Sequence, residues 1–365
     1  MHIEKIELHN FRNYSNLELE FSKNVNLILG KNAQGKTNLL EAVYLTAIGR
    51  SFRTSKDIDL VKFNENNSIV KVWAEKELNS TTVEISIKRK GEKSSEKYIK
   101  KDKKNVTRTS QLLKNILIVI FSPEDLKIVK DEPEKRRKFI DRELSQISPK
   151  YYNSLSNYKK SLLQRNTYLK EENLEPSIID IWDVQLSKYG AEVIFLREKF
   201  IEKLSEYSSK IHSGITGGKE KLDILYEPNV EIKQSLSEQE DFIYSELKNS
   251  FKTDSRNRNT SVGPHRDDIL FVVNDIDMRN FGSQGQQRTC ALSLKLAELN
   301  LIKEKTDEDA ILLLDDVMSE LDADRQEFLI DTMKNNQLFI TTTELDQNIK
   351  DKFKELKIFY IENGN

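Results

Sequence analysis

Near its start the chain carries eight consecutive residues of the types and spacing that bind phosphate. They read GKNAQGKT and fit the pattern G-x-x-x-x-G-K-[ST] at every position. The glycines let the backbone wrap its N–H groups around phosphate oxygens, and the helix predicted to follow presents its N-terminal amides to the same anion. We therefore expect these residues to bind the phosphates of a nucleotide: Gly30, Lys31, Asn32, Ala33, Gln34, Gly35, Lys36 and Thr37.

Two side chains of this loop have the chemistry of catalysis and metal binding. We expect Lys36 to reach the β- and γ-phosphates and Thr37 to bind Mg²⁺. An apolar strand precedes the loop and a helix follows it, which is the context that the motif requires. The alternative is a chance glycine-rich turn before a helix, and the full motif in this context disfavours it.

A pair of carboxylates follows a second apolar strand, late in the chain. Asp315 and Asp316 come directly after the run Ile311–Leu314. This is the Walker B pattern, in which Asp315 would hold Mg²⁺ through water and Asp316 would polarise the attacking water as a general base. Alone, the pattern is more typical of a core strand that ends in a solvated turn. Beside a phosphate-binding loop, a catalytic set of Lys36, Asp315 and Asp316 is the better interpretation.

A third loop precedes the helix predicted from about residue 284. It resembles the signature loop of ABC ATPases, Leu-Ser-Gly-Gly-Gln, which closes over the nucleotide of another protomer. Gly282 stands at the leucine position and Gln284 at the first glycine position. A glycine-containing helix N-cap is the alternative for this loop alone. The residues expected to act in trans are Ser283, Gln284, Gly285 and Gln286, and Ser319 and Asp322 after the second strand resemble the D-loop of the same superfamily.

Some expected ABC positions differ in this chain. No glutamine occurs at Ser122–Asp125, where the Q-loop should lie, and no switch histidine occurs at Ile340–Thr343, where Thr341 or Thr342 is the candidate to replace it. The second carboxylate is aspartate rather than the usual glutamate, and its shorter reach suits slow hydrolysis. No Asn-Lys-x-Asp motif occurs, which argues against a Ras-type GTPase. The resemblance to ABC ATPases implies ATP, with Mg²⁺, as the nucleotide.

Strand patterns open and close the chain, and helices dominate its middle. Alternating or apolar runs predict strands at 3–8, 17–21, 25–29, 69–74, 83–87, 116–121, 222–226, 269–273, 311–314 and 338–341. We therefore expect an α/β fold, an ABC-type P-loop ATPase head with a mixed sheet and an N-terminal antiparallel portion. The expected ATPase domain is 1–125 plus 260–365, interrupted by a helical insertion at 126–259 that is too short for a long coiled coil.

Composition limits the class of protein. The chain has 58 Lys and Arg against 60 Asp and Glu, a net charge of −2, which excludes a globally basic nucleic-acid coat. Its apolar runs are far shorter than the ~18 residues of a membrane span, and its N-terminus lacks the apolar core of a signal peptide. One cysteine, Cys290, excludes an internal disulfide. We expect a soluble cytoplasmic protein with no membrane partner.

Basic residues nevertheless gather locally. Between residues 88 and 104 there are nine basic residues against three acidic ones, in what looks like an exposed hairpin. Such a cluster could contact DNA phosphates, although a solvated charged surface is an equally good interpretation of any one cluster. The candidate DNA contacts are Lys88, Arg89, Lys90, Lys100, Lys101, Lys103, Lys104, Arg136 and Arg137.

Taken together, the motifs resemble one family over essentially the full length of the chain. The matching stretches are Phe11–Tyr14, Gly30–Thr37, Gly49–Arg53, Phe121–Leu126, Arg136–Asp141, Gly263–Asp268, Gly282–Arg288 and Leu312–Asp322. They resemble the RecF family of bacterial recombination mediators, which is similar to SMC-type ATPase heads without the long coiled coil. Neither His265 nor Arg266 in these stretches has a role that the sequence assigns, and a structural turn is the expectation.

The resemblance implies an ATP-dependent homodimer that binds double-stranded and gapped DNA. It implies work with RecR and RecO to load RecA, in DNA repair, replication and the SOS response, with weak DNA-stimulated ATP hydrolysis used as a switch. Arg12 and Asn13 would contact the nucleotide, as their counterparts do in related heads. Two alternatives are the nucleotide-binding subunit of a membrane transporter and a non-hydrolysing interaction protein that ATP switches.

Overall fold

The computed structural model extends over the 365 residues and describes all of them except 77–78, 92, 108–110, 345–352, 354 and 365. The chain forms two compact units, and each is described by itself. Unit 1 comprises Met1–Asp125 and Glu298–Asn365, and unit 2 comprises Leu126–Ala297.

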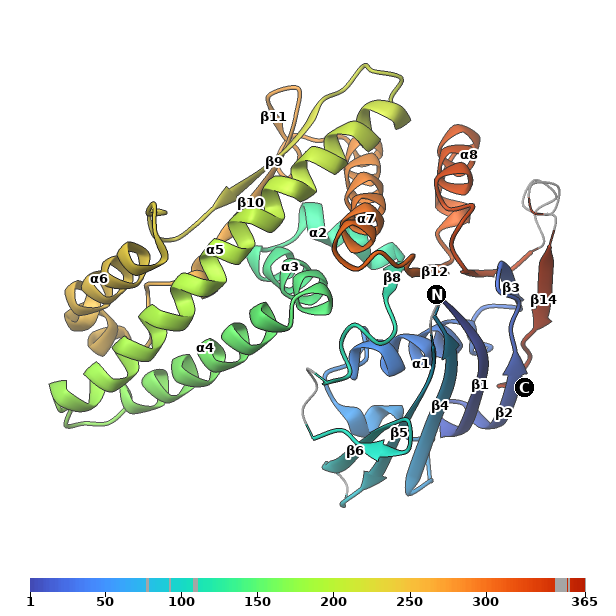
Figure 1. Cartoon of the computed structure of the whole chain (residues 1–365), viewed down its shortest axis with the longest axis horizontal. Helices are drawn as coiled ribbons and strands as arrows, with labels where there is room; N and C mark the ends of the chain where they lie inside the picture. The colour runs from blue at the N-terminus through green and yellow to red at the C-terminus, as the bar shows by residue number, and fades with distance from the viewer. Residues whose placement is uncertain (77–78, 92, 108–110, 345–352, 354, 365) are drawn as a thin grey trace. The chain divides into compact units, whose positions relative to one another are not determined.

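An antiparallel sheet forms one layer of unit 1, with strand order β2-β1-β4-β5-β6-β7 (Figure 1). Buried and partly exposed residues alternate along β4 and β5, so one face of the sheet packs on the core and the other faces water. The strands are β1 (His2–Phe11), β2 (Tyr14–Glu20), β4 (Asn67–Glu75), β5 (Ser80–Arg89), β6 (Ser95–Lys101) and β7 (Lys104–Asn105).

A parallel sheet forms the second layer, with order β14-β3-β13-β12-β8. Its strands β3, β12 and β8 are buried along their whole length, as expected for parallel strands covered on both faces. The expected mixed α/β head fold is confirmed. The strands are β14 (Leu356–Tyr360), β3 (Val25–Leu29), β13 (Leu338–Thr342), β12 (Ile311–Asp315) and β8 (Ile118–Phe121).

Helix α1 (Lys36–Ile48) contacts strands of both sheets in unit 1. Its buried residues, among them Leu39, Leu40 and Val43, belong to one hydrophobic cluster with residues of β1, β4, β5 and the parallel strands. Because that cluster fixes the helix, it also fixes the loop from which the helix starts. The other elements of this unit are the short helices η1 (Asp57–Leu60), η3 (Pro123–Asp125) and η5 (Met318–Glu320), α8 (Ala323–Thr332), and the end of α7 (Gln284–Thr306).

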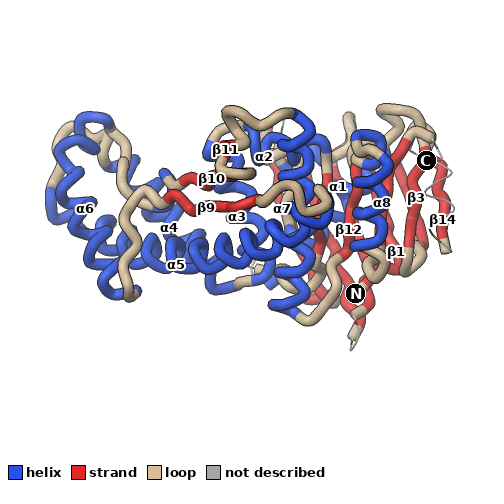
Figure 2. Tube along the Cα trace, turned by 90° about the horizontal axis from the view of Figure 1, so that it is seen from above, coloured by secondary structure: helices blue, strands red, loops and turns tan. Residues whose placement is uncertain are grey.

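Unit 2 is built on long helices, the longest of which is α5 with 40 residues (Figure 2). At ~1.5 Å per residue such a helix spans about 60 Å, and α5 packs on α4, α6 and β9 rather than extending as a coiled-coil arm. The helices are α2 (Leu126–Lys130), α3 (Pro133–Ile147), α4 (Pro149–Tyr168), α5 (Pro176–Ile215), η4 (Pro264–Arg266) and α6 (Leu236–Asn257).

The second unit extends beyond the helical segment expected at 126–259. Strand β10 (Asp268–Val273) pairs antiparallel with β9 (Leu222–Glu227) along its length, and β11 (Ile276–Asp277) pairs with β10. This small sheet draws residues up to Ala297 into unit 2, including the first turns of α7. The sequence showed β9 and β10 as strands but not that they would pair, and it did not show β11.

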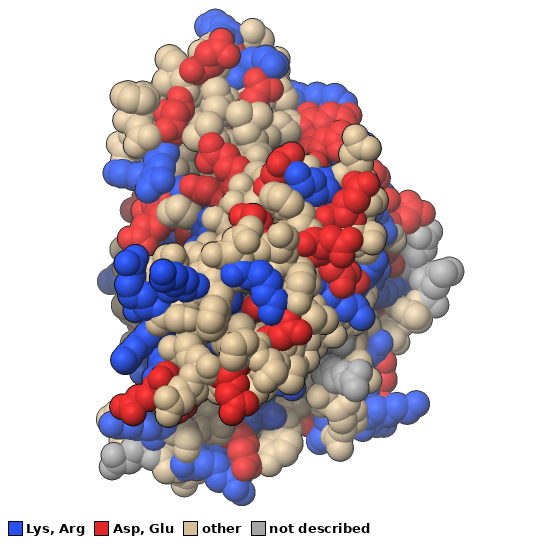
Figure 3. All heavy atoms as spheres, turned by 90° about the vertical axis from the view of Figure 1, so that its left-hand side faces the viewer, with Lys and Arg blue, Asp and Glu red and all other residues tan. Residues whose placement is uncertain are grey.

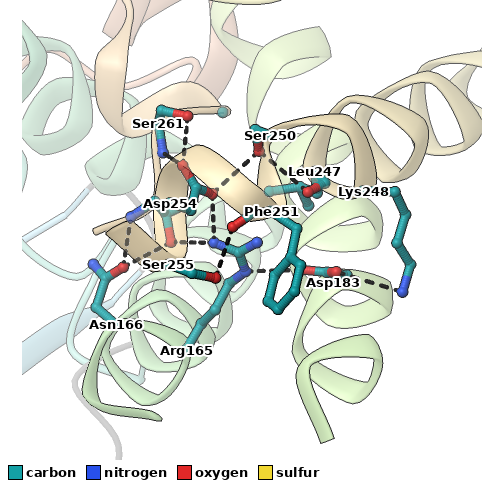
Figure 4. A network of polar contacts seen from close by, with 12 residues as sticks. Arg165, Asn166, Asp183, Leu247, Lys248, Ser250, Phe251, Asp254, Ser255 and Ser261 are labelled. Carbon is teal, nitrogen blue, oxygen red and sulfur yellow. Dashed lines mark hydrogen bonds and ion pairs between the residues drawn. The ribbon is translucent and has the colours of Figure 1, made fainter. Parts of the chain in front are cut away.

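A buried charge network holds the helices of unit 2 together (Figure 4). The guanidinium of Arg165 donates to Asp183 at 2.8 Å and to Asp254 at 2.7 Å, and all three side chains are 0% exposed. Its Nη1 also donates to the hydroxyl of Thr260 at 2.9 Å. Burial raises the pKa of Asp183 although the charge of Arg165 opposes this effect. The network thus joins α4, α5, α6 and the segment after α6.

The turn at Gly263–Asp268 is also fixed from within. The ring of His265 lies between the Tyr158 hydroxyl, 2.7 Å from Nδ1, and the backbone oxygen of Thr260, 3.0 Å from Nε2. Burial lowers the pKa of His265 to about 4, so its ring is neutral at physiological pH. Asp267 accepts from Arg197 at 2.9 Å. These residues therefore stabilise the η4 turn in unit 2.

We predict that Asp254→Ala lowers the free energy of unfolding by about 3–5 kcal/mol, because it leaves the buried Arg165 guanidinium short of one carboxylate. Urea unfolding followed by circular dichroism measures the change. The control is Lys138→Ala, because the exposed ion pair of Lys138 with Glu134 contributes little to stability. This variant should unfold at the same urea concentration as the parent chain. A loss below about 1 kcal/mol for Asp254→Ala would show that Arg165 does not depend on this partner.

Candidate functional site

The phosphate-binding loop leaves the carboxyl end of β3 and enters α1. Gly35 has φ 119°, which an L side chain rarely adopts, and a Cβ there would lie 2.6 Å from the Asn13 amide nitrogen. A Cβ on Gly30 would lie 2.4 Å from the backbone oxygen of Ile361. Gly30 is therefore required by close backbone approach, and Gly35 by its conformation and by the Asn13 side chain beside it. Lys31, Asn32 and Ala33 are exposed at the tip of the loop.

The lysine of the loop is folded onto the loop itself. Lys36 is 4% exposed, and its Nζ donates to the backbone oxygen of Gly30 at 2.6 Å. The ammonium group thus lies over the backbone that would surround a phosphate. This is the position from which the side chain can bind β- and γ-phosphates.

Three parallel strands place the first carboxylate beside the loop. β13 lies between β3 and β12, with Thr341 opposite both Asp315 and Ile28. The Thr37 hydroxyl donates to Asp315 Oδ1 at 2.8 Å, and the Thr341 hydroxyl donates to the same oxygen at 2.9 Å. Burial raises the pKa of Asp315, and the hydrogen bonds from Thr37 and Thr341 partly offset this effect.

The oxygen atoms at this edge suit a hard divalent cation. A threonine hydroxyl and a carboxylate are the ligand types that Mg²⁺ takes beside phosphate oxygens and water. Thr37 and Asp315 are the pair in contact at 2.8 Å, so the expected metal ligands lie together. Asp316 follows with φ 53°, and its backbone N–H donates to the Thr341 hydroxyl at 3.0 Å. The second carboxylate is therefore held at the end of β12 by the neighbouring strand.

Arg12 and Asn13 contact the loop and its helix from the turn after β1. The Arg12 guanidinium donates twice to the buried carboxylate of Glu41, at 2.8 and 2.6 Å. The Asn13 amide donates to the backbone oxygen of Gln34 at 2.8 Å and accepts from Asn38 at 2.8 Å. Asn13 therefore positions the loop directly, and Arg12 is anchored through α1.

Sequence reasoning missed two side chains of this site. Glu41 is 0% exposed and also accepts from Arg53 at 3.4 Å, while Arg53 donates to Asn38 at 2.6 Å. The charge of Arg53 lowers the pKa of Asp315, against the larger effect of burial. A glutamate among apolar helix positions was the available signal for Glu41. Arg53 lies in Gly49–Arg53, one of the stretches that match the family, and nothing else in the sequence pointed to it.

The signature-like loop belongs to unit 2 and begins α7. The Ser283 hydroxyl accepts from the Gln286 N–H at 3.2 Å, and the Gln286 side chain accepts from the Ser283 N–H at 3.1 Å. This reciprocal capping satisfies the backbone N–H groups of Ser283 and Gln286. Ser283, Gln284 and Gly285 are exposed, as is Phe281 before them.

The D-loop residues lie after β12 in unit 1. The Ser319 hydroxyl donates to the backbone oxygen of Asp316 at 2.8 Å, which fixes the loop to the backbone at that residue. The Asp322 side chain accepts from the Arg325 N–H at 3.0 Å and caps α8. Both side chains thus have local structural contacts.

The structure removes Arg136 from the candidate DNA contacts. Its side chain is 1% exposed and donates to both carboxylate oxygens of Asp268, at 2.6 and 2.9 Å. A DNA phosphate cannot reach a guanidinium buried in an ion pair. The prediction failed because a run of basic residues on a helix does not show which of them points inward. Arg137 remains half-buried, with Nη1 bonded to the backbone oxygen of Asp267.

The basic hairpin consists of β5 and β6. Lys88, Lys90, Lys103 and Lys104 are exposed, whereas Arg89 is partly buried. Lys100 pairs with Glu84 at 3.0 Å and Lys101 is partly buried, so they are less available. Figure 3 shows basic and acidic side chains interspersed over one face of the molecule, in keeping with the near-zero net charge.

The family model for the RecF/RecN/SMC N terminal domain matches residues 2–365. The DNA replication and repair protein RecF of Clostridium tetani (strain Massachusetts / E88) is 44% identical over 367 residues, covering 100% of this chain and 99% of the relative. The protein of the same name from Clostridioides difficile (strain 630) is 42% identical over 369 residues, covering 100% and 98%. The chain belongs to the RecF family. The expected resemblance is confirmed, and these relatives do not support a transporter subunit.

Solved structures agree with the family. A chain described as the recombination mediator protein RecF-ATPrS in the RecFOR pathway superposes with a TM-score of 0.91 at 38% identity, covering 100% of this chain and 96% of that one. An Smc head bound to the C-winged helix domain of ScpA has a TM-score of 0.57 at 17% identity and shares the fold alone. None of the helices in the described part of the chain has the length and apolar character to cross a membrane.

We predict that Asp315→Asn stabilises the metal-free chain at neutral pH more than in acid. The folded state binds the Asp315 proton more tightly than the unfolded state, so the parent chain loses stability as pH rises from 3.8 through the raised pKa. The variant lacks this loss because its side chain does not ionise. Urea unfolding of both chains across this range measures the difference. A difference that stays constant with pH would contradict the burial of an ionisable Asp315.

Proposed function

We propose that this chain is an ATP-dependent DNA-binding recombination mediator, in which ATP and Mg²⁺ occupy the edge formed by Gly30–Thr37 and β12. The contact between Thr37 and Asp315 carries the proposal, because it brings the two expected metal ligands to one point beside the loop. A solved RecF relative is described as RecF-ATP. At 38% identity over this whole chain, that relative supports the same ligand here.

In the proposed reaction the loop amides and Lys36 bind the β- and γ-phosphates. Arg12 and Asn13 hold the loop in shape and complete the nucleotide contacts. Thr37 and Asp315 would hold Mg²⁺, which would supply charge neutralisation at the phosphates. Asp316 orients and deprotonates the attacking water. Its carboxylate is one methylene shorter than a glutamate, so we infer slow hydrolysis that DNA stimulates, with ATP used as a switch.

The signature residues act on the nucleotide of a second copy. Ser283, Gln284 and Gly285 are exposed at the start of α7, and Gln286 is held by the Ser283 cap. Each copy therefore offers helix-terminal amides to an anion, and ATP bound between two copies would join them as a homodimer. Ser319 and Asp322 would line the same interface.

DNA binding would follow from dimerisation. Each copy has a net charge of −2, so a monomer binds DNA weakly until two sets of local basic residues face one duplex. The candidate contacts are Lys88, Arg89, Lys90, Lys100, Lys101, Lys103, Lys104 and Arg137. Because solved relatives are described as recombination mediators in the RecFOR pathway, we propose RecR and RecO as partners at gapped DNA. RecA loading, DNA repair, replication, the SOS response and a cytoplasmic location belong to the same proposal.

Lys36→Ala should weaken ATP binding by at least about tenfold, because a charge-assisted bond to phosphate is worth roughly 1.5–3 kcal/mol. Isothermal titration with ATP and Mg²⁺ measures the affinity, and sedimentation reports dimerisation. The control is Lys23→Ala, an exposed lysine just before β3. Dimerisation of the Lys36→Ala variant with ATP, to the same extent as the parent, would overturn the proposed site.

Ser283→Arg should separate ATP binding from dimerisation. In the proposed mechanism Ser283 acts on the nucleotide of the second copy and not on its own, so ATP affinity of the monomer should remain within about twofold. A bulky cation at the exposed signature should block closure over the second copy. Sedimentation with ATP and Mg²⁺ reports this. A dimer that forms normally would exclude the signature from the interface.

A further inference from the structure

Unit 2 contains an open pocket of about 520 Å³ close to the signature loop. It is formed by the end of α5, the following loop and the turn after β10. Apart from Gly218, all of its lining residues have polar or charged side chains. Such a lining favours a charged or hydrogen-bonding ligand over an apolar one. The lining residues are Ser209, Lys210, Ser213, Gly218, Lys219, Glu220, Lys221 and Asn274.

The donors in this pocket match the oxygens of a phosphate group. Lysine ammonium groups and serine hydroxyls are the side chains that contact phosphate in nucleic-acid complexes. Three lysines line the pocket against a single glutamate, so its net charge is positive. Within the described part of the chain, the hydroxyls of Ser209 and Ser213 make no hydrogen bond and Lys219 makes no ion pair. These groups have no acceptor inside unit 2.

The ion pairs that two of these lysines make within unit 2 are weak. Lys210 pairs with Glu206 and Lys221 pairs with Asp223, each at 2.8 Å, but both pairs are exposed and contribute little. The end of α5 is capped by backbone amides, since the N–H of Gly218 donates to Ser213 at 2.8 Å. This backbone oxygen at the end of α5 therefore does not require a lysine ammonium group as its donor, and the ammonium groups can bind a ligand.

Glu220 joins the pocket to the signature. Its Oε1 accepts from the Gln286 amide at 2.9 Å, and the same Gln286 side chain accepts from the Ser283 N–H at 3.1 Å. A phosphate beside Glu220 would repel its carboxylate. Because Gln286 bridges Glu220 and Ser283, that repulsion would act on the residue that caps α7.

The other side of Glu220 is fixed by a buried histidine. His212 is 0% exposed, with Nε2 at 3.1 Å from Glu220 Oε2 and Nδ1 at 3.1 Å from the Ser293 hydroxyl. Ser293 itself donates to the backbone oxygen of Thr289 at 2.8 Å. Glu220 is thus held between the pocket and α7 by His212 on one side and Gln286 on the other.

We propose that this pocket binds a phosphate group of a nucleic-acid backbone and that Glu220 transmits its occupancy to Gln286 and Ser283. Glu220 is a positioning residue, because it acts on the nucleotide only through the signature. The effect on hydrolysis rests on the function proposed above. Phosphate binding by the pocket does not, and it can be tested without ATP. A small free phosphate would use the same donors, so the experiment separates the two sources.

The first test compares the double variant Lys219→Gln/Lys221→Gln with Lys252→Gln, an exposed lysine on α6 of the same unit. Fluorescence anisotropy of a labelled duplex is measured over a salt series, with and without ATP. Losing one phosphate contact should reduce the slope of log K against log salt by about one and weaken binding at each salt concentration. The control should keep the parent slope.

The second test uses Glu220→Gln, which keeps the shape and an acceptor but removes the charge. Duplex affinity should stay the same or rise, because a negative group leaves the pocket, while DNA should lose its effect on the rate of ATP turnover. A residue that only stabilises unit 2 would not separate these two measurements. If DNA stimulates the variant as it does the parent, Glu220 does not carry the signal.

Inorganic pyrophosphate distinguishes the source of the phosphate. Both chains carry Lys36→Ala in this measurement, because the nucleotide loop would otherwise bind pyrophosphate as well. If pyrophosphate raises the melting temperature of the chain with the pocket lysines but not of the chain with Lys219→Gln/Lys221→Gln, while the duplex slopes are equal, the pocket binds free phosphates instead of DNA. Equal slopes with no pyrophosphate effect overturn the pocket altogether. If neither ATP nor Lys36→Ala changes duplex binding, the proposed ATP switch fails, and the ATP-free salt slope still decides the pocket.

Discussion

The hydrogen bond between Thr37 and Asp315 is the contact on which the proposed chemistry depends, and it exists only because three parallel strands are in register. The loop follows β3, Asp315 ends β12, and β13 lies between these two strands. Thr341 of β13 is a second donor to Asp315 Oδ1, beside Thr37. A shift of one residue in any strand would turn these side chains to the other face of the sheet. Because β3 and β12 are buried on both faces, each side chain packs in its own layer, and a shift would disrupt that packing on both sides of the sheet.

Local motifs were predictable because the residues that carry their chemistry are adjacent in the sequence. The loop, the carboxylate pair and the cap at Ser283 each occupy a few consecutive positions, and the structure places them at strand and helix ends as expected. Long-range pairings were not predictable in this way. The burial of Arg136 against Asp268 joins residues 132 positions apart, and β10 pairs with β9 across more than forty positions. The extent of unit 2 follows from such pairings. β14 gave no clear pattern and was missed.

Buried polar groups have different structural roles in the two units. In unit 1 they surround the loop, where Glu41 fixes Arg12 and thereby the turn after β1. In unit 2, Arg165 and Arg197 each join several helices through carboxylates, and the Gly263–Asp268 turn is fixed by His265 and Asp267. Removing one partner from such a network leaves an uncompensated charge, which makes the arrangement specific. The stretch that matched the family without an assigned role is therefore explained by folding.

The loop also has a partner from the far end of the sequence. The Asn363 N–H donates to the Gln34 side chain at 2.7 Å across 329 residues, and the Ile361 N–H donates to Leu29 at 2.8 Å. The loop therefore takes its shape only when a segment more than three hundred residues away has paired beside β3. Contacts of such high sequence separation form slowly, so we expect the loop to be ordered late in folding.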